Sequence, residues 1–404
     1  MTATIRAETA HDFLALVPHL VGYRPARSLV CVAFEGARTV GVVRHDLPDA
    51  ATIDATAGAI LGTLCRMPRV DAAVVVAYVD ESFGGGGVPV RGVIEAIAHR
   101  LETAGFAVRD ALCVAADGWG SLLDASLPPG GRRMELIEGS RAARRARKET
   151  GRPPATTAAD LVVLPEPRAD LAEPIRGVLD GLDGTSRDDG ALEDRVGEAL
   201  DAIEAAVGAA ADPLVLVERV AAGDARSPEE LGWLLHLSAQ PPIRDAMMLQ
   251  AAFGPLIGEL ALDAAAEPET AGVGSPAHDV APDRAGAEPV DDVLARLLLG
   301  RSCTRPDPGR VHRSLEVVTL AIGNAPAGRR SGALCIAAWL AWALGRGSAA
   351  GALVDLARAE TPEHTMAALL ERFLGTGALP DWAFTEPDAA GAGAGGRPAA
   401  GARR

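Results

Sequence analysis

Four polar residues near the start of the chain have the chemistry of an anion site. Arg24 and Ser28 lie in the turn Tyr-Arg-Pro-Ala-Arg-Ser, and Arg44 and Asp46 lie in a β-rich run that follows it. Arg44 and Asp46 share one face of an extended strand, because side chains alternate between its two faces. A guanidinium beside a hydroxyl and a carboxylate can hold a phosphate or a carboxylate. The alternative is a structural salt bridge that ties the turn to the strand.

The register of the predicted hairpin decides which of these side chains meet. If the loop is Glu35–Ala37, Ser28 lies opposite Arg44, and the polar residues converge at the open end of the hairpin. If the loop is one residue longer, Ser28 lies opposite His45, because a one-residue slip turns every side chain to the other face. That register would assemble a serine, a histidine and an aspartate, as in a hydrolytic triad. The chain contains no GxSxG elbow, so we predict no catalytic residues.

A second candidate site follows the apolar run VVVAYV, which has the pattern of a strand buried on both faces. Asp80, Glu81, Gly84 and Gly85 come after it. Ligands of α/β proteins bind beyond the carboxyl ends of strands, where glycine amides can cradle a phosphate and carboxylates can hold Mg²⁺. The glycines lack GxGxxG spacing, so a flexible loop with exposed acids is the alternative. No histidine or cysteine pair has metal-ligand spacing, and we predict neither a metal site nor a cofactor.

A basic run farther along the chain is a third candidate. Arg141, Arg145 and Lys148 share one face of a predicted helix, with Arg144 beside them. This face suits nucleic acid or an acidic partner. It carries no aromatic residues for base stacking, and the net charge of −15 opposes long-range approach to nucleic acid. We therefore do not expect nucleic acid to be the partner, and a solvated helix or a brace onto the acidic C-terminal part is the alternative.

An α/β domain must position these residues. The first third of the chain has the pattern helix, hairpin, helix, strand, helix, strand, which predicts a mixed sheet with one parallel crossover. Periodicity predicts an all-α domain in the remainder, and Ser227-Pro228-Glu229-Glu230 predicts a capped helix start. Pro242–Leu262 is predicted as continuous helix, and Leu334–Pro362 has tetratricopeptide-like offsets that predict a stacked helix pair. The predicted organisation is an α/β domain at 1–125, a Pro/Gly-rich, partly basic connecting segment at 126–187, helical parts at 188–263 and 290–385, a disordered linker or loop at 264–289 and a disordered tail at 386–404.

Composition places the chain among globular cytoplasmic proteins. Hydrophobic residues make up 48% of the 404 residues, which is enough for a sizeable core. The five cysteines form no CxxC motif, so reduced thiols are expected. We expect no signal peptide, because no basic segment precedes an apolar one at the N-terminus. The most apolar segment, Ala333–Gly345, is too short to span a bilayer, so no membrane association is predicted.

The chain resembles an uncharacterised family of high-GC actinobacterial proteins, a domain of unknown function with no assigned activity. The N-terminal motif LVPHLVGYRPARSLV is the most specific part of this resemblance, and the other matching positions include Arg44, Asp46-Leu47-Pro48, the strand around Val74–Tyr78, Trp119 and Arg244-Asp245-Ala246. The resemblance implies cysteines soon after Trp119, but this chain has SLLDASLPPGGRR there. Any metal or redox role tied to that element is therefore not expected in this protein.

Two functions remain open at the level of sequence. The first is a non-enzymatic cytosolic binding or scaffolding protein that offers its helical domain to a protein partner. The alternative is an α/β enzyme or sensor that binds a small anionic ligand or phosphate between the Arg24–Ser28 turn and the Asp80–Gly87 loop.

Overall fold

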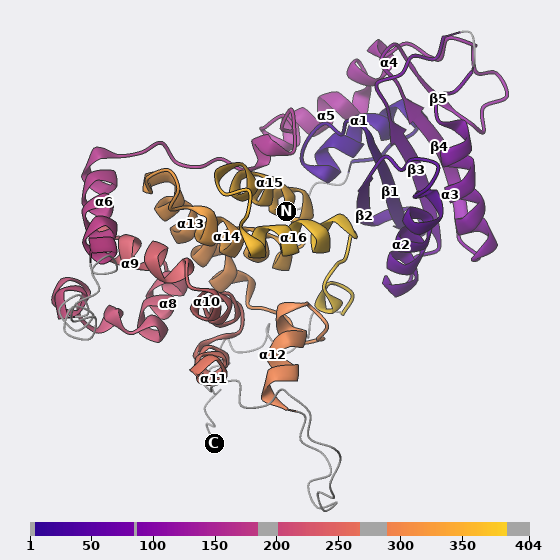
Figure 1. The fold of residues 1–404 in the computed structure, drawn as a ribbon. Helices are drawn as coiled ribbons and strands as arrows, with labels where there is room; N and C mark the ends of the chain where they lie inside the picture. Colours follow the sequence, from indigo (N-terminus) through magenta and orange to yellow (C-terminus); the bar gives the residue numbers. More distant parts are fainter. Residues whose placement is uncertain (1–4, 85–86, 185–200, 267–288, 386–404) are drawn as a thin grey trace, which may run out of the picture.

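The structure, a computed structural model, describes residues 5–84, 87–184, 201–266 and 289–385. Figure 1 shows an α/β domain at one end and a larger group of helices beside it. The segment after the α/β domain crosses the helical part to its far side before the first long helix begins. The predicted linker and tail fall almost entirely outside the described residues, as does Gly85 of the glycine loop.

A five-stranded mixed sheet forms the α/β domain. Its strand order is β2-β1-β3-β4-β5, and only β3 and β4 run parallel, as the strand–helix–strand pattern predicts. Because β1 is antiparallel to both β2 and β3, strands β2, β3 and β4 end at the same edge of the sheet, where β1 begins. The strands are β1 (Ser28–Glu35), β2 (Arg38–Asp46), β3 (Ala72–Tyr78), β4 (Ala107–Val114) and β5 (Trp119–Ser121).

Helices cover both faces of this sheet. Leu29, Cys31 and Ala33 face one layer of helices, and Val30 and Val32 face the other, so β1 is buried on both sides. The first layer consists of α2 (Ile53–Arg66) and α3 (Arg91–Thr103), whose apolar stripes pack on the sheet. The opposite layer is α1 (Ala10–Val21), with α4 (Glu135–Glu138) against the sheet and α5 (Arg141–Thr150) packed on α1. The domain is therefore a three-layer sandwich.

The hairpin register differs from both predicted registers at its open end. Glu35 pairs with Arg38, and a β-bulge then leaves Val40 without a partner on β1. The bulge shifts the ladder by one more residue, so Ser28 lies opposite Asp46. The predicted pairings of Ser28 with Arg44 and with His45 are both wrong.

The bulge nevertheless keeps the predicted polar residues on one face. A shift of two residues from the first predicted register restores the same facing, so Ser28, Arg44 and Asp46 share one side of the sheet. His45 pairs with Leu29 and points to the other side. The arrangement that would bring Ser28 and His45 together is therefore excluded.

An all-α domain forms the second part of the chain, as predicted. Ser227 and Glu230 form the predicted capping box at the start of α9. The predicted continuous helix at 242–262 is instead broken at Gly254, whose φ of 97° ends α10 and lets α11 begin in a new direction. The helices are α6 (Ala169–Gly184), α8 (Pro213–Ala222), α9 (Pro228–Ser238), α10 (Pro241–Phe253), α11 (Pro255–Ala266), α12 (Val290–Leu298), α13 (Pro308–Asn324), α14 (Ser331–Ala343), α15 (Gly347–Glu360) and α16 (Thr365–Gly375).

The centre of the helical domain is α14. Every residue of α14 is buried, and it packs against α9, α10, α13, α15 and α16. A helix that is apolar all round must lie inside other helices, which explains why the most apolar segment of the chain stays in a protein core. The pair α14–α15 forms where the tetratricopeptide-like offsets predict it, and its likeness to that repeat stays a prediction. None of the described helices is long and apolar enough to cross a membrane.

The two domains meet at the β2–α2 side of the sheet. The Arg66 guanidinium of α2 pairs with Asp381 and lies 4.0 Å from the centre of the Phe384 ring. Gly377, in the loop after α16, lies so close to the ring of His45 that a Cβ there would be 2.3 Å from its Cε1 atom. These contacts hold the end of β2 against the helical domain.

The connecting segment also joins the domains. Tyr23 forms an isolated bridge with Ala155, and a 3₁₀ turn at Ala159–Leu161 contacts α15. The side chain of Leu161 approaches Gly22, at the end of α1. The segment therefore packs back on the α/β domain through a turn rather than through a strand.

Candidate functional site

A hollow of about 610 Å³ lies at the sheet edge where β2 and β3 end and β1 begins. Its position follows from the topology, because the antiparallel β1 brings the turn before it next to the ends of its two neighbours. We call it the edge hollow. Its lining residues are Ala26, Arg27, Arg44, Asp46, Leu47, Asp80 and Glu81.

Arg44 is fixed at the edge hollow by a buried serine. Its Nε and Nη2 atoms donate to the Ser28 hydroxyl at 3.0 and 2.8 Å, and that hydroxyl donates to the Ala26 carbonyl at 2.7 Å. The Arg44 Nη2 atom also lies 2.7 Å from Asp46 Oδ1. This ion pair lies within β2, so it is not the expected salt bridge between the turn and the strand; the hydrogen bonds from Arg44 to Ser28 make that connection, and the same guanidinium lines the hollow. Ser28 directs its proton to a carbonyl, which leaves it no role as a nucleophile.

Arg27 adds a second guanidinium and carries backbone strain. Its φ is 46°, in the left-handed region that residues with a side chain rarely adopt. The Arg27 carbonyl accepts a 2.9 Å hydrogen bond from the Leu47 amide, which holds the turn against the end of β2. Such a conformation costs roughly 1–3 kcal/mol and is typical of ligand-binding segments. The exposed Arg27 side chain forms no ion pair with any described residue.

Two exposed carboxylates, those of Asp80 and Glu81, line the hollow together with Asp46. The loop that carries them is anchored to the next strand, because the Ala116 amide donates to the Glu81 carbonyl at 3.0 Å. The Phe83 amide donates to Asp117 Oδ1 at 2.9 Å. No group of three or more metal-ligating side chains occurs among the described residues, so a cation here would need ligands from a bound molecule.

The structure brings together most of the residues that the sequence singled out for this site, and two of the described ones lie outside the hollow. Arg44, Asp46, Asp80 and Glu81 line one hollow, and Ser28 lies directly beneath Arg44. Arg24 is exposed and does not line the hollow, and its amide donates to the Ala155 carbonyl instead. Gly84, with a φ of 49°, also lies outside the lining, and Gly85 is outside the described residues.

Sequence reasoning missed Arg27 and Tyr78. The turn offers Arg24 and Arg27, and only the backbone path decides which one faces the edge of the sheet. Tyr78 lies opposite Ser28 across the β1–β3 ladder, and its buried hydroxyl has no hydrogen-bond partner among the described residues. Its position in the run VVVAYV, at the end of a buried strand, was the available signal.

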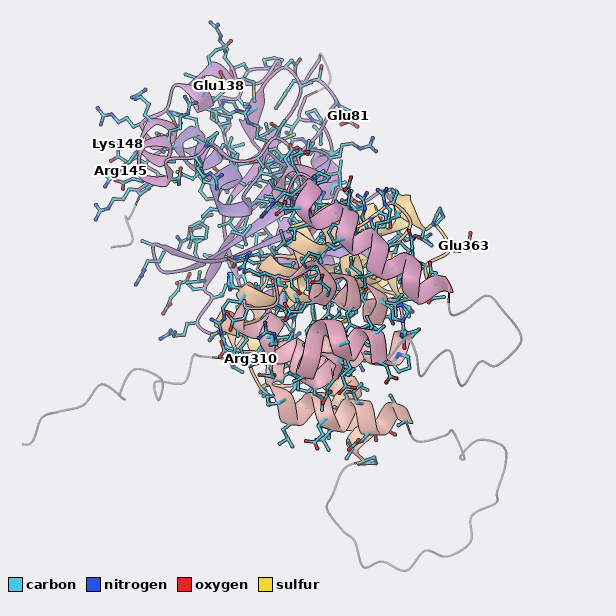
Figure 2. The ribbon with its side chains drawn as sticks, turned by 90° about the vertical axis from the view of Figure 1, so that its left-hand side faces the viewer. Glu81, Glu138, Arg145, Lys148, Arg310 and Glu363 are labelled. Atoms are coloured by element: carbon cyan, nitrogen blue, oxygen red, sulfur yellow. The ribbon has the colours of Figure 1, made fainter. Side chains whose placement is uncertain are left out.

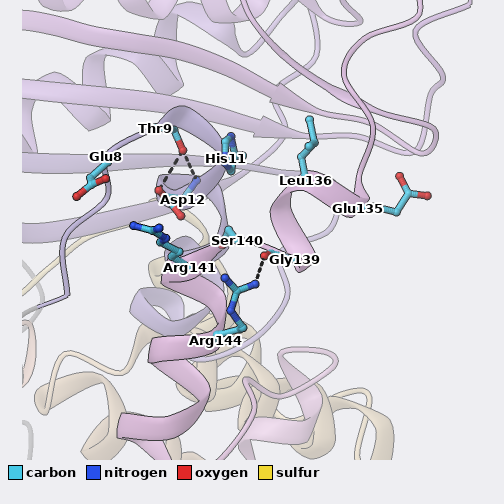
Figure 3. A pocket seen from close by; sticks show the side chains of 10 residues that line it. All are labelled: Glu8, Thr9, His11, Asp12, Glu135, Leu136, Gly139, Ser140, Arg141 and Arg144. Carbon is cyan, nitrogen blue, oxygen red and sulfur yellow. Dashed lines mark hydrogen bonds between the residues drawn. The ribbon is translucent and has the colours of Figure 1, made fainter.

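A second hollow, of about 380 Å³, lies between the start of α1 and the start of α5 (Figure 3). Its polar floor is Asp12, which is 7% exposed and accepts from the Ala142 amide and from the Thr9 hydroxyl. Burial favours a higher pKa for Asp12, but these hydrogen bonds outweigh it and hold the pKa below its ordinary value. The amino end of α5 is therefore already capped by a carboxylate of the protein. An external anion would compete with that carboxylate.

The predicted basic helix exists as α5, and the structure settles which face is free. Ala142, Ala143 and Ala146 are buried against α1. The basic residues are all exposed: Arg141 and Arg144 line the second hollow, and Figure 2 shows Arg145 and Lys148 projecting outward on the side opposite Glu81. The helix packs on α1 with its basic residues exposed, and the expected alternative of a brace onto the C-terminal part stays a prediction.

One thiol–imidazole pair occurs in the helical domain, between Cys335 Sγ and His364 Nδ1 at 3.7 Å. Burial raises the pKa of the Cys335 thiol to about 12 and lowers the pKa of His364. The Ala367 amide donates to the same Nδ1 atom, because His364 caps α16. Cys335 is thus a neutral core residue, not an activated nucleophile.

Four buried or half-buried histidines make stability depend on pH. Burial is the main cause that lowers the pKa of His19, His45, His236 and His364 below the ordinary value of 6.5. The unfolded chain then binds more protons than the folded one as pH falls below about 6.5, so folding stability decreases in that range. We expect a lower urea midpoint at pH 5.5 than at pH 7.5. An equal or higher midpoint at pH 5.5 would show that these imidazoles are not desolvated.

The fold and the edge hollow define a two-domain α/β and all-α protein with a charged ligand-sized hollow at the carboxyl edge of its sheet. The chain belongs to the family described as Domain of unknown function (DUF4192), which it matches over residues 11–266 and 312–381. Every residue that lines the edge hollow, and all of α5, lies within the matched part. No curated protein and no solved structure matches the chain.

Proposed function

We propose that this protein is a sensor or carrier of a small anionic ligand, which binds in the edge hollow. The observation that supports this most directly is that Arg27 and Arg44 both line a hollow at the carboxyl edge of the sheet. Two guanidinium groups that reach one hollow from different elements can bind a phosphate or carboxylate through several charge-assisted hydrogen bonds.

The rest of the hollow narrows the ligand class. Asp46, Asp80 and Glu81 line the same hollow, so a bare polyanion would meet repulsion from these carboxylates. A ligand with an anionic group and either a cationic group or an associated Mg²⁺ matches both the arginines and the carboxylates, since Mg²⁺ commonly binds one or two carboxylates together with a phosphate. We therefore expect Mg²⁺–phosphate compounds to bind better than phosphate alone.

We expect a nucleotide or inorganic pyrophosphate with Mg²⁺ to raise the melting temperature of the wild-type protein. A ligand at one hundred times its Kd stabilises the folded state by about 2.7 kcal/mol. Arg27→Ala should remove the shift, because Arg27 is one of the two arginines that line the hollow. Its loss leaves the fold intact, since this side chain forms no ion pair with the described residues. Arg44→Ala should remove it as well, and Asp80→Ala should remove the part that depends on Mg²⁺. The measurement is thermal denaturation across a panel of phosphate compounds.

Arg91→Ala is the matched control for these variants. Arg91 is exposed on α3, pairs with Glu95 and does not line the edge hollow. Its replacement by alanine removes one positive charge, as Arg27→Ala and Arg44→Ala each do. It should leave any ligand-induced shift unchanged. A shift that survives both Arg27→Ala and Arg44→Ala, or the absence of a shift with every compound, would contradict the proposal.

A protein partner and a cytoplasmic location belong to the same proposal. A sensor needs a surface that reports whether the ligand is bound. The end of β2 joins the two domains, because Asp46 lines the hollow and the adjacent His45 packs against Gly377 of the helical domain. A bound ligand would thus lie one residue from the domain contact. The helical surface as the site of that partner stays a prediction, which pull-down with and without the ligand would test.

A further inference from the structure

The outer face of α5 is a dense group of cations that the fold does not use. This basic face consists of Arg141, Arg144, Arg145, Arg147 and Lys148, all exposed. Ser140 caps the helix by accepting from the Ala143 amide at 2.9 Å, and Gly151, with a φ of 63°, ends it. Alanines fill the inner face, so helix formation and packing need none of the five charges.

Most of these charges have no internal partner. Arg145 lies 3.9 Å from Glu149, and Arg144 donates to the Gly139 carbonyl. Among the residues that the structure describes, Arg141, Arg147 and Lys148 form no ion pair. Arg141 opens the helix, where the helix dipole disfavours a cation. The basic face is therefore electrostatically unfavourable for the isolated protein.

Acidic side chains near α5 already bind other groups or line the hollow beside it. Asp12 accepts hydrogen bonds from the Ala142 amide and Thr9, and Glu135 lies 3.3 Å from Arg133. Glu8 and Glu135 line the neighbouring hollow together with Arg141 and Arg144 (Figure 3). The basic face therefore extends from this hollow, which Arg141 and Arg144 line, to Arg145, Arg147 and Lys148 beyond it.

The chemistry of the basic face favours an acidic protein segment as its partner. It presents no apolar or aromatic side chain that could insert into a bilayer or stack on bases, so a partner must be recognised through its charge. Arg141, Arg145 and Lys148 form a row with steps of roughly 5–6 Å along the helix, which suits carboxylates at similar spacing. An extended nucleic acid would also meet the remainder of a chain with net charge −15, whereas a short acidic segment would contact α5 alone.

We infer that the basic face of α5 docks a short acidic segment of a partner protein. This surface lies on the opposite side of the α/β domain from Glu81 of the edge hollow, so partner and ligand can bind together (Figure 2). The inference stands independently of the ligand proposed for the edge hollow.

The test uses the full-length chain and fluorescein-labelled oligoglutamate, with a DNA duplex of equal charge as competitor. The variant Arg141→Gln/Arg145→Gln/Lys148→Gln should weaken oligoglutamate binding about tenfold, since three lost ion pairs together account for roughly that factor. The matched control is Arg100→Gln/Arg176→Gln/Arg372→Gln, which removes three exposed arginines from α3, α6 and α16. It should change binding by less than about twofold. Fluorescence anisotropy measures both, and circular dichroism checks that each variant is folded.

Three results would overturn the inference. Equal weakening in the control would show that overall charge alone governs binding. Preferential displacement of oligoglutamate by the duplex would assign the face to nucleic acid. The absence of oligoglutamate binding to the wild-type chain at low salt would show that α5 holds no acidic segment.

Discussion

Trp342→Ala is expected to destabilise the helical domain by about 3–5 kcal/mol, the range for removal of a large buried aromatic side chain. Trp342 is 1% exposed at the centre of an aromatic group, with ring centroids 5.0 Å from Phe373 and 5.8 Å from Trp382. Its Nε1–H donates to the Ala378 carbonyl at 2.9 Å, and that carbonyl would lose its partner. Urea unfolding followed by circular dichroism measures the change.

Trp342→Phe is the control that separates volume from the hydrogen bond. It keeps an aromatic ring against Phe373 and Trp382 but removes the indole donor, so the loss should be clearly smaller than for alanine. A loss below about 1 kcal/mol for the alanine variant would show that α14 is not packed as the structure has it.

The second large effect is expected at Gly332, where α14 touches the end of α9. A Cβ at Gly332 would lie 2.2 Å from the Ser238 carbonyl oxygen and 2.6 Å from its carbon. Both are backbone atoms in a buried segment, so the two helices must separate. Gly332→Ala should therefore cost about 3 kcal/mol, the upper part of the usual range for overpacking, despite the better helix propensity of alanine.

Gly351→Ala is the same substitution and should change folding stability in the opposite direction. Gly351 lies within α15, and no atom lies within 4 Å of a Cβ built there. This variant should stabilise the protein by about 0.5–1 kcal/mol, because alanine restricts the unfolded chain and favours the helix. If Gly332→Ala raised the urea midpoint as Gly351→Ala is expected to do, the close contact between α14 and α9 would be refuted.

Apolar periodicity was sufficient to predict the two domains and most of their elements. VVVAYV forms a fully buried strand because it is apolar at every position, and the Ser227 capping box starts α9 because its local hydrogen bonds need no tertiary context. The break between α10 and α11 was missed because a helix-like apolar pattern continues through Gly254. The dipeptide Gly254-Pro255 was the available signal, because glycine commonly ends a helix and proline commonly begins one.

The candidate site was predictable as far as it depends on strand direction. Asp46 and Asp80 each follow a strand that ends at the same edge, so their proximity follows from topology. The hairpin register was harder to predict, because the one sign of the bulge at Val40 is the neighbouring Gly41, and an isolated glycine in a strand does not fix the register. The sequence also did not show that Arg27, and not Arg24, lines the hollow, since this depends on an unfavourable φ at Arg27.

Hydrogen–deuterium exchange with and without saturating Mg²⁺–pyrophosphate tests the central claim most directly, because it reports where the ligand binds. The account predicts slower exchange in three segments that meet at the edge hollow, residues 26–30, 44–48 and 79–83, with no change in α5. Protection confined to the start of α5, around Ser140 and Arg144, would instead place the anion in the second hollow. Protection there, or no protection in any of the three segments, would contradict the account.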